Sequence, residues 1–192
     1  MTVFAVIGHL AKTTGDFSLN DMPGGAGRMD VLCRCVNTSL FLSHDLRRDV
    51  TVYLILLGGT DAPKTVMVSG EKVRYLNPDE RSAGSLIKKA LEIPAGTEFR
   101  ESTKGVFVRR GGLDQLLGEH EFSVLDESGT DSNGSGDLPE AFILSDHMDF
   151  TPEEQELMKD LPKYSVGPRV LHADHTITVI LNHIDRKKTE AG

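Results

Sequence analysis

The chain has 192 residues, of which 39% are hydrophobic and 26% charged, and its formal net charge is −8. This length predicts one ordinary domain spanning residues 1–192. Apolar runs such as 50–57 are far shorter than the ~20 residues that cross a membrane, and the first residues lack the basic start of a signal peptide. We therefore expect a soluble, cytoplasmic protein. The two cysteines, Cys33 and Cys35, are too close along a predicted helix to form a disulfide framework or a zinc cage, so neither a metal nor a disulfide is expected.

The charge is distributed unevenly along the sequence. Residues 1–111 carry 15 basic and 12 acidic side chains, whereas residues 112–162 carry 14 acidic side chains and one basic side chain, Lys159. A polyanion could therefore bind the N-terminal portion while the acidic segment faces solvent. A merely solvated acidic face explains the same numbers equally well.

The first half of the chain predicts a βαβ unit. Residues 2–8 and 50–57 are apolar, β-branched runs typical of buried strands. Between them, apolar residues at helical spacing predict an amphipathic helix over 27–45, preceded by a glycine-rich turn. A right-handed crossover would make the two strands parallel.

The second half continues the alternation of strands and helices. Asn77-Pro78-Asp79-Glu80 and Thr151-Pro152-Glu153-Glu154 are strong helix starts, with an N-cap, a proline and acidic residues in the first turn. These patterns predict a three-layer α/β sandwich around a mainly parallel sheet. The remaining expected elements are a helix from 77 to about 91, strands at 106–108, 122–125, 141–144 and 164–166, a short helix at 113–117, a flexible loop at 126–137, an acidic helix through 159 and a closing helix at 176–184.

The polar residues that follow the last strands are the best candidates for a binding site. In open parallel sheets, ligands bind beyond the carboxyl ends of the strands. Three such segments, 144–147, 166–168 and 171–178, fall in the last quarter of the chain. Gly167 would allow backbone to approach a ligand closely, and the polar residues from His172 to Thr176 precede a helix. Together they indicate a cradle for a small molecule.

Other kinds of site fit the sequence less well. His147, His172, His175 and Asp174 are residue types that bind zinc, but no glutamate base or thiol accompanies them. A helix-capping Asp174 and a surface His175 explain this segment better than a metal hydrolase does. The motifs of serine hydrolases, phosphate-binding loops and dinucleotide folds are absent or misplaced.

Basic residues gather near the start of the first predicted helix. Arg28 and Arg34 follow the turn at 24–27, where helix amides would add to their attraction for phosphate. For Arg34, an ordinary ion pair with Asp30 one helical turn away is the competing interpretation. For Arg28, which follows a glycine-rich turn, we favour contact with an incoming ligand.

Five ordered motifs, spread over essentially the whole chain, carry a specific resemblance. The chain resembles the archaeal tRNA pseudouridine N1-methyltransferases, a family of the SPOUT superfamily of trefoil-knotted methyltransferases. The motifs are Pro-Gly-Gly-Ala-Gly-Arg-Met-Asp-Val-Leu-Cys-Arg-Cys-Val at 23–36, Ser-His-Asp-Leu-Arg-Arg-Asp-Val at 43–50, Leu-Asn-Pro-Asp-Glu-Arg-Ser at 76–82, Phe-Ile-Leu-Ser-Asp-His at 142–147 and Leu-His-Ala-Asp-His-Thr-Ile-Thr-Val at 171–179.

The resemblance implies a fold, a cofactor and a substrate. It implies a C-terminal trefoil knot over about 140–186, S-adenosylmethionine as methyl donor, pseudouridine 54 in the T-loop of tRNA as acceptor, and a homodimer. The expected dimer contacts are Ile177, Ile180, Leu181 and Ile184 on the closing helix, although their spacing serves a core face equally well. Many relatives have cysteine where this chain has Thr176. The residues expected to bind the cofactor are Leu144, Gly167, Leu171, His172, Thr176 and Ile177.

The methyl-transfer chemistry implied by the resemblance suggests further candidate residues, for proton transfer and for RNA binding. Pseudouridine is linked to its ribose through carbon, so N1 carries a proton that a carboxylate could accept while the nitrogen attacks the methyl group. Asp30 and Asp79 are the candidates for this role, with N-capping or ion pairing as the competing explanation of each. Arg28, Arg34 and Arg81 are expected to bind RNA. A non-catalytic RNA-binding or assembly protein with the same fold is the alternative function.

Overall fold

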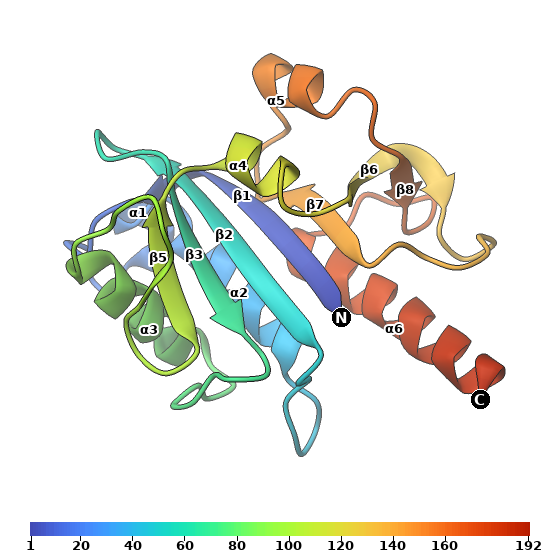
Figure 1. Cartoon of the computed structure of the whole chain (residues 1–192), viewed down its shortest axis with the longest axis horizontal. Coiled ribbons are helices and arrows are strands. Elements are labelled where there is room, and N and C mark those ends of the chain that lie inside the picture. Colours follow the sequence, from blue (N-terminus) through green and yellow to red (C-terminus); the bar gives the residue numbers. More distant parts are fainter.

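A computed structural model describes all residues, 1–192, and is built around one eight-stranded sheet (Figure 1). The helices and strands alternate along the chain much as the sequence predicts. In chain order they are β1 (Thr2–Lys12), α1 (Met22–Gly25), α2 (Met29–Leu40), β2 (Val50–Gly58), β3 (Lys64–Ser69), α3 (Glu80–Glu92), β4 (Arg100–Glu101), β5 (Val106–Arg110), α4 (Leu113–Leu117), β6 (Phe122–Asp131), β7 (Ala141–Ser145), α5 (Pro152–Leu157), β8 (Lys163–Ser165) and α6 (Ala173–Ala191).

The sheet has two halves with different strand directions. Its order is β4-β5-β3-β2-β1-β7-β6-β8. Strands β2, β1, β7, β6 and β8 pair in parallel and form what we call the parallel half. Strands β3, β5 and β4 add to β2 in antiparallel pairs and form the antiparallel half. The prediction of a mainly parallel α/β sheet is therefore confirmed, while β3 was not anticipated.

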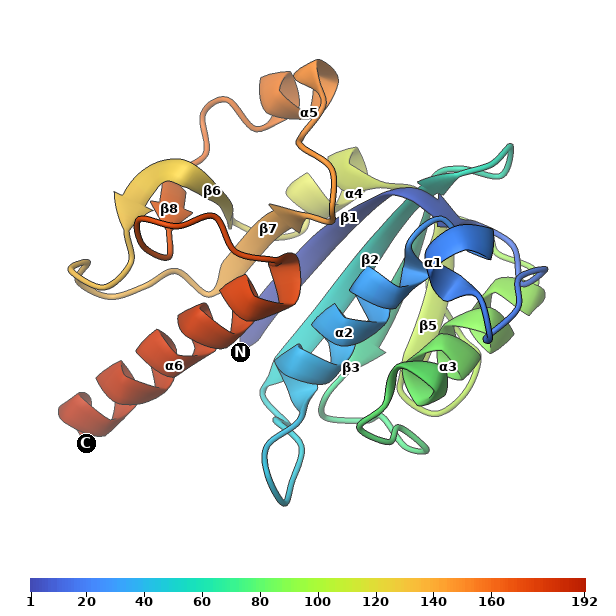
Figure 2. The ribbon, with the colours of Figure 1, turned by 180° about the vertical axis from the view of Figure 1, so that it is seen from behind.

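The two faces of the sheet are covered unequally. Helices α1, α2, α3 and α6 lie on one face (Figure 2), whereas the short α4 lies on the other (Figure 1). The core under the long helices contains 35 buried hydrophobic residues, and the core on the opposite face contains 12. The second face of the sheet is therefore covered by less helix and by a smaller core than the first.

The closing helix α6 packs its apolar face against the chain's own core. Ile177 and Ile180 are fully buried and Leu181 nearly so, and all three belong to the large core cluster beside α2, while Ile184 packs against its edge. These side chains are not free to contact another subunit, so the expectation that they form a dimer face is wrong. Their i, i+3, i+4, i+7 spacing serves the core.

Several predicted boundaries move in the structure. Helix α2 ends at Leu40 instead of residue 45, and α6 begins at Ala173, three residues earlier than expected. Strand β6 continues to Asp131, into the segment predicted as a loop, because its polar outer part pairs with the edge strand β8. None of the helices is both long and apolar enough to cross a membrane.

Candidate functional site

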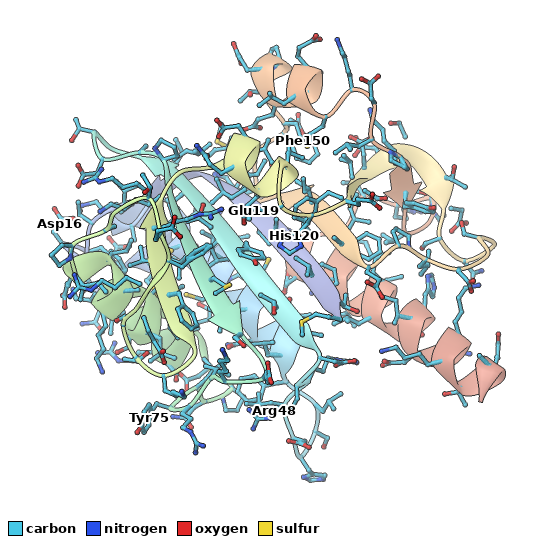
Figure 3. The ribbon with its side chains drawn as sticks, in the orientation of Figure 1. Asp16, Arg48, Tyr75, Glu119, His120 and Phe150 are labelled. Carbon is cyan, nitrogen blue, oxygen red and sulfur yellow. The ribbon has the colours of Figure 1, made fainter.

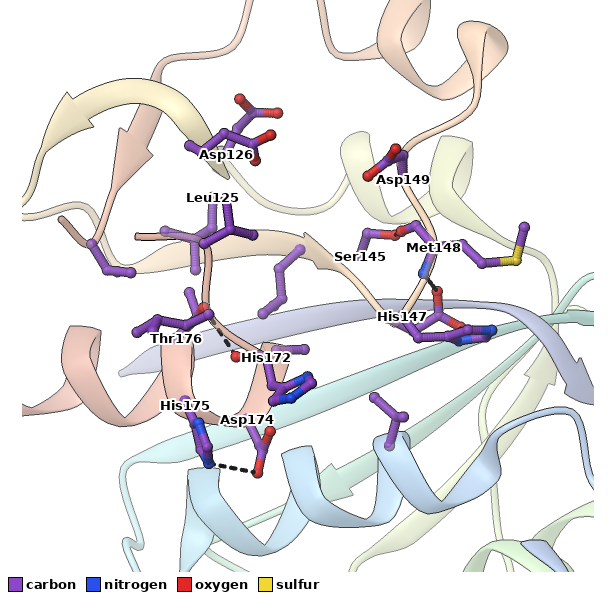
Figure 4. A pocket seen from close by; sticks show the side chains of 18 of the residues that line it. Leu125, Asp126, Ser145, His147, Met148, Asp149, His172, Asp174, His175 and Thr176 are labelled. Atoms are coloured by element: carbon purple, nitrogen blue, oxygen red, sulfur yellow. Dashed lines mark hydrogen bonds and ion pairs between the residues drawn. The ribbon is translucent and has the colours of Figure 1, made fainter. Parts of the chain in front are cut away.

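A cavity of about 980 Å³ lies at the carboxyl ends of β7 and β8, beside the middle of β6 and at the start of α6 (Figure 4). This is the location expected for a ligand in an open parallel sheet. Four chain segments and four single residues form its wall. They are residues 125–127, 144–150, 164–167 and 169–176, together with Arg28, Val31, Arg34 and Gln155.

Most of the residues expected to bind the cofactor line this cavity. Leu144, Gly167, Leu171, His172 and Thr176 all contribute to its wall. Ile177 does not, because it points into the large core cluster and has no exposed surface.

The backbone at Gly167 has the open geometry expected for close approach to a ligand. Its φ of +133° lies in a region that side chains rarely adopt. A Cβ added there would meet no atom within 4 Å. A larger side chain would therefore enter the empty space of the cavity.

The start of α6 presents free backbone amides to the same space. His172 is the N-cap, but its side chain accepts no capping hydrogen bond, and Asp174 lies in the first turn instead of capping the helix. The Thr176 hydroxyl donates to the carbonyl of His172 at 3.2 Å, so its hydrogen is already used within the helix. Amides at the start of a long helix favour electron-rich ligand atoms.

A buried carboxylate holds two arginines at the mouth of the cavity. Asp30 accepts from Arg28 Nε and Nη2 at 3.0 and 3.1 Å and from Arg34 Nη1 at 3.0 Å. Arg28 has a left-handed backbone, φ 62°, directly after Gly27, which is also left-handed. An added Cβ at Gly27 would lie 1.7 Å from the carbonyl oxygen of Leu10, so only glycine fits this turn. The ion pair predicted between Arg34 and Asp30 is present, and Arg28 lines the cavity, while its contact with a ligand stays a prediction.

The two carboxylates expected to accept a proton lie outside the cavity wall. Burial alone would raise the pKa of Asp30, but hydrogen bonds from Arg28 and Arg34 outweigh this effect and lower the pKa. A carboxylate held in its charged form this way is a poor base. Asp79 caps α3, accepting from the Ser82 amide at 2.7 Å, as the competing interpretation had it. Arg81, which donates to Asn20 Oδ1 at 2.6 Å, is exposed and is also absent from the wall.

The histidines of the last quarter do not form a metal centre. His172 and His175 meet edge to face, with ring centroids 5.7 Å apart, and His147 pairs with Asp146. No group of three or more His, Cys, Asp or Glu side chains is arranged to hold a metal ion.

A buried ionic cluster beneath the cavity wall was missed by the sequence interpretation. His9, in the carboxyl-terminal part of β1, lies between Asp146 and Glu154, with distances of 2.9 Å from Nδ1 to Asp146 Oδ1 and 2.7 Å from Nε2 to Glu154 Oε1. Burial opposes the charged imidazole, yet the two carboxylates raise the pKa of His9 to about 9. The expectation that the acidic segment faces solvent is therefore wrong for Glu154, which is buried. The only sequence signal was a lone histidine at the end of an otherwise apolar strand.

The fold and the cavity define the class of protein. The sequence model of a family described as "Putative SAM-dependent RNA methyltransferase" matches residues 1–189. The chain belongs to this family of SAM-dependent RNA methyltransferases.

Individual relatives match the chain over its whole length. A tRNA (pseudouridine(54)-N(1))-methyltransferase of Methanocorpusculum labreanum is 63% identical and covers 100% of both chains. Proteins of the same name from Methanospirillum hungatei and Haloferax volcanii are 50% and 48% identical, covering 98% and 96% of each chain. A crystal structure of Archaeoglobus fulgidus Nep1 bound to S-adenosylhomocysteine has the same fold, with a TM-score of 0.64 at 18% identity, covering 98% of this chain and 99% of Nep1.

These findings confirm the predicted family and the SPOUT-type α/β fold. The trefoil knot over 140–186 stays a prediction.

Proposed function

We propose that this protein transfers a methyl group from S-adenosylmethionine to N1 of pseudouridine 54 in tRNA. The observation that carries the proposal is the cavity at the carboxyl ends of the parallel strands. It gathers the segments that sequence reasoning assigned to the cofactor and, at the same mouth, the two arginines assigned to RNA. The names of relatives that are 48–63% identical over their full length support the same activity.

The donor fits the cavity in size and in the character of its wall. A volume of about 980 Å³ lies at the upper end of the range of small-molecule sites, so it leaves space for a base beside the cofactor. Apolar side chains at Leu125, Leu144 and Val166 suit an adenine ring, while the free amides at the start of α6 suit polar edges. The acidic side chains Asp126 and Asp174 suit the positive charge of the sulfonium and amino groups.

The reaction itself demands little from the protein. N1 of pseudouridine attacks the methyl carbon, the carbon–sulfur bond breaks, and the N1 proton leaves to a nearby acceptor. Because the sulfonium is already activated, alignment of N1 with the methyl group supplies most of the acceleration. The base must leave its stack in the T-loop to reach the cavity.

We propose positioning roles for Asp30 and Asp79 in place of direct proton transfer. Asp30 fixes Arg28 and Arg34 at the cavity mouth, where their remaining N–H groups face incoming RNA, and Asp79 starts α3, whose Glu80 also accepts from Arg34 at 2.9 Å. Asp30→Asn should lower tRNA affinity about tenfold by releasing the arginines. It should leave the pH dependence of kcat unchanged, whereas loss of a general base would change that profile.

A homodimer remains part of the proposal, with a different contact surface from α6. Large apolar side chains at the cavity rim, Val170 (75% exposed) and Leu171 (38% exposed), face solvent and are suited to pairing with a second copy of the chain. Light scattering at micromolar concentration should show a dimer, and Val170→Asp should weaken it. A monomeric wild-type protein would contradict this part of the proposal.

The activity is tested with two matched T-loop RNAs that contain uridine or pseudouridine at the target position. The protein with S-adenosylmethionine should methylate only the pseudouridine RNA, because uridine has no N–H at the corresponding ring position. Equal methylation of both RNAs would contradict N1 specificity. Binding of both RNAs without methylation, and without affinity for S-adenosylhomocysteine, would favour the non-catalytic RNA-binding alternative.

A further inference from the structure

The short helix α5 is attached to the molecule in an unusual way. Within its bounds only Glu154 is buried, whereas Leu157 is exposed, and Met158 directly after the helix packs into the smaller core. A buried carboxylate without a partner is strongly unfavourable. The partner of Glu154 therefore holds α5 in place together with the apolar contact of Met158.

That partner comes from the central strand of the parallel half. In β1, Val3, Ala5 and Ile7 face the smaller core, and alternation carries the side chain of His9 to the same face. Its Nε2 contacts both oxygens of Glu154, at 2.7 and 3.0 Å. The side chain of His9 is 5% exposed and that of Glu154 10%, so the pair is shielded from water.

The second arm of the cluster shapes the cavity wall. Asp146, whose side chain is 1% exposed, accepts from His9 Nδ1 at 2.9 Å and from the His9 backbone amide at 3.1 Å. It also accepts from the Met148 amide at 3.1 Å and thereby closes the turn after β7. Figure 4 shows His147, Met148 and Asp149 in this turn, at the edge of the cavity.

We infer that His9 is a positioning residue: its imidazolium, held between Asp146 and Glu154, fixes the wall segment 145–150 and helix α5, which carries the wall residue Gln155, to β1 in the shape that receives the cofactor. The identity of the cofactor rests on the proposed function. The attachment of the wall does not, because it follows from contacts within the chain.

The two carboxylates of the cluster require His9 to be in its protonated, positively charged form. Both ring nitrogens face carboxylate oxygens, so each must donate. The other titratable group in contact is His147, whose Nδ1 lies 3.2 Å from Asp146 Oδ2, and Arg28 acts on Asp146 through space. A neutral His9 would leave one carboxylate without its donor.

The test compares His9→Gln with His120→Gln as the matched control. His120 is also hydrogen-bonded and packed among aromatic rings, to Tyr53 at 3.2 Å, but it lies on the open face of the sheet and does not line the cavity (Figure 3). Calorimetry with S-adenosylhomocysteine should show affinity lowered at least tenfold in His9→Gln and unchanged in His120→Gln. Steady-state kinetics should show a raised KM for S-adenosylmethionine with kcat nearly unchanged.

Two further measurements keep the test decisive. Hydrogen exchange of residues 145–157 should be faster in His9→Gln without any ligand, and Glu154→Gln, a milder change, should act in the same direction. Wild-type affinity should fall above about pH 9, and this fall should be absent in His9→Gln. Unchanged exchange in this segment, or unchanged affinity, would overturn the inference. A wild-type protein that does not bind S-adenosylhomocysteine would instead overturn the proposed cofactor, and the exchange data would still decide the role of His9.

Discussion

The parallel and antiparallel halves of the sheet have different roles: the cavity lies around the parallel half, and the antiparallel half contributes to the core. Every cavity residue except those at the start of α2 belongs to the chain from 125 onward, around β6, β7, β8 and α6, and none comes from residues 35–124. The antiparallel half, β3, β5 and β4, contributes buried residues such as Val66 and Val108 to the core instead. Parallel strands bring their carboxyl ends to one edge, and a right-handed crossover leaves a loop at each end. Antiparallel neighbours alternate direction and gather no such set of loops.

The sharpest test of this division uses two glycines with nearly the same backbone geometry. Gly167, in the cavity, has φ +133°, and Gly111, directly after β5, has φ +127°. Valine at either position should cost roughly 1–3 kcal/mol of stability through backbone strain. Only Gly167→Val should also fill the cavity, so we expect its affinity for S-adenosylhomocysteine to fall by more than 100-fold while Gly111→Val binds normally. Equal affinities measured by calorimetry would place the cofactor elsewhere.

The second prediction, with a smaller expected effect, concerns the pH dependence of stability in the parallel half, to which His9 belongs. Because the pKa of His9 is raised from 6.5 to about 9 in the folded state, its contribution to the free energy of unfolding is complete below about pH 6.5. This contribution, on the order of 3 kcal/mol, is lost as the pH rises through 9. Urea unfolding between pH 6 and 10 should show this loss in the wild type and a flatter profile in His9→Gln. Identical profiles would contradict a charged His9.

A third, smaller effect separates arginines of the two halves. Arg28→Ala should lower tRNA affinity about five- to tenfold and reduce the slope of log K against log salt by roughly 1, since one phosphate contact is lost. Arg100→Ala in β4, an exposed arginine of the antiparallel half, should change neither quantity. Filter binding over a range of salt concentrations provides both numbers. Equal losses from the two variants would show that tRNA also covers the antiparallel half.

The smallest effect is expected on the acidic helix. Glu153 is exposed on α5, in contrast to its buried neighbour Glu154. Glu153→Lys should therefore leave stability within about 0.5 kcal/mol of wild type and add only weak nonspecific attraction for RNA. Loss of specific tRNA binding in this variant would make the acidic segment part of the recognition surface.

The sequence was most informative where local chemistry decides the structure. Alternation of buried strands with amphipathic helices predicted the parallel half. The signal at Thr151 predicted the start of α5, whereas the signal at residues 77–80 placed the start of α3 three residues too early, because Asp79 and not Asn77 is its N-cap. Strand β3 was missed because Lys64 and Thr65 are buried by pairing with strands on both sides, which no local pattern reveals.

The site could be predicted only in part, because some of its residues depend on long-range contacts and not on local sequence. Loops after successive strands converge by topology, so Leu144, Gly167, Leu171, His172 and Thr176 were found together. The roles of Asp30 and His9 depend on partners that the fold supplies. Asp30 is held by two arginines of its own helix region, and His9 meets carboxylates 137 and 145 residues away. The spacing of residues along the chain cannot predict long-range contacts such as those of His9.

The most direct test of the central claim is a hydrogen-exchange footprint of S-adenosylhomocysteine on the wild-type protein. Binding should slow exchange in residues 125–127, 144–150 and 164–176 and leave β3, β4 and β5 unchanged. Protection in the antiparallel half, or in the 510 Å³ hollow beside Tyr53 and His120, would contradict the account.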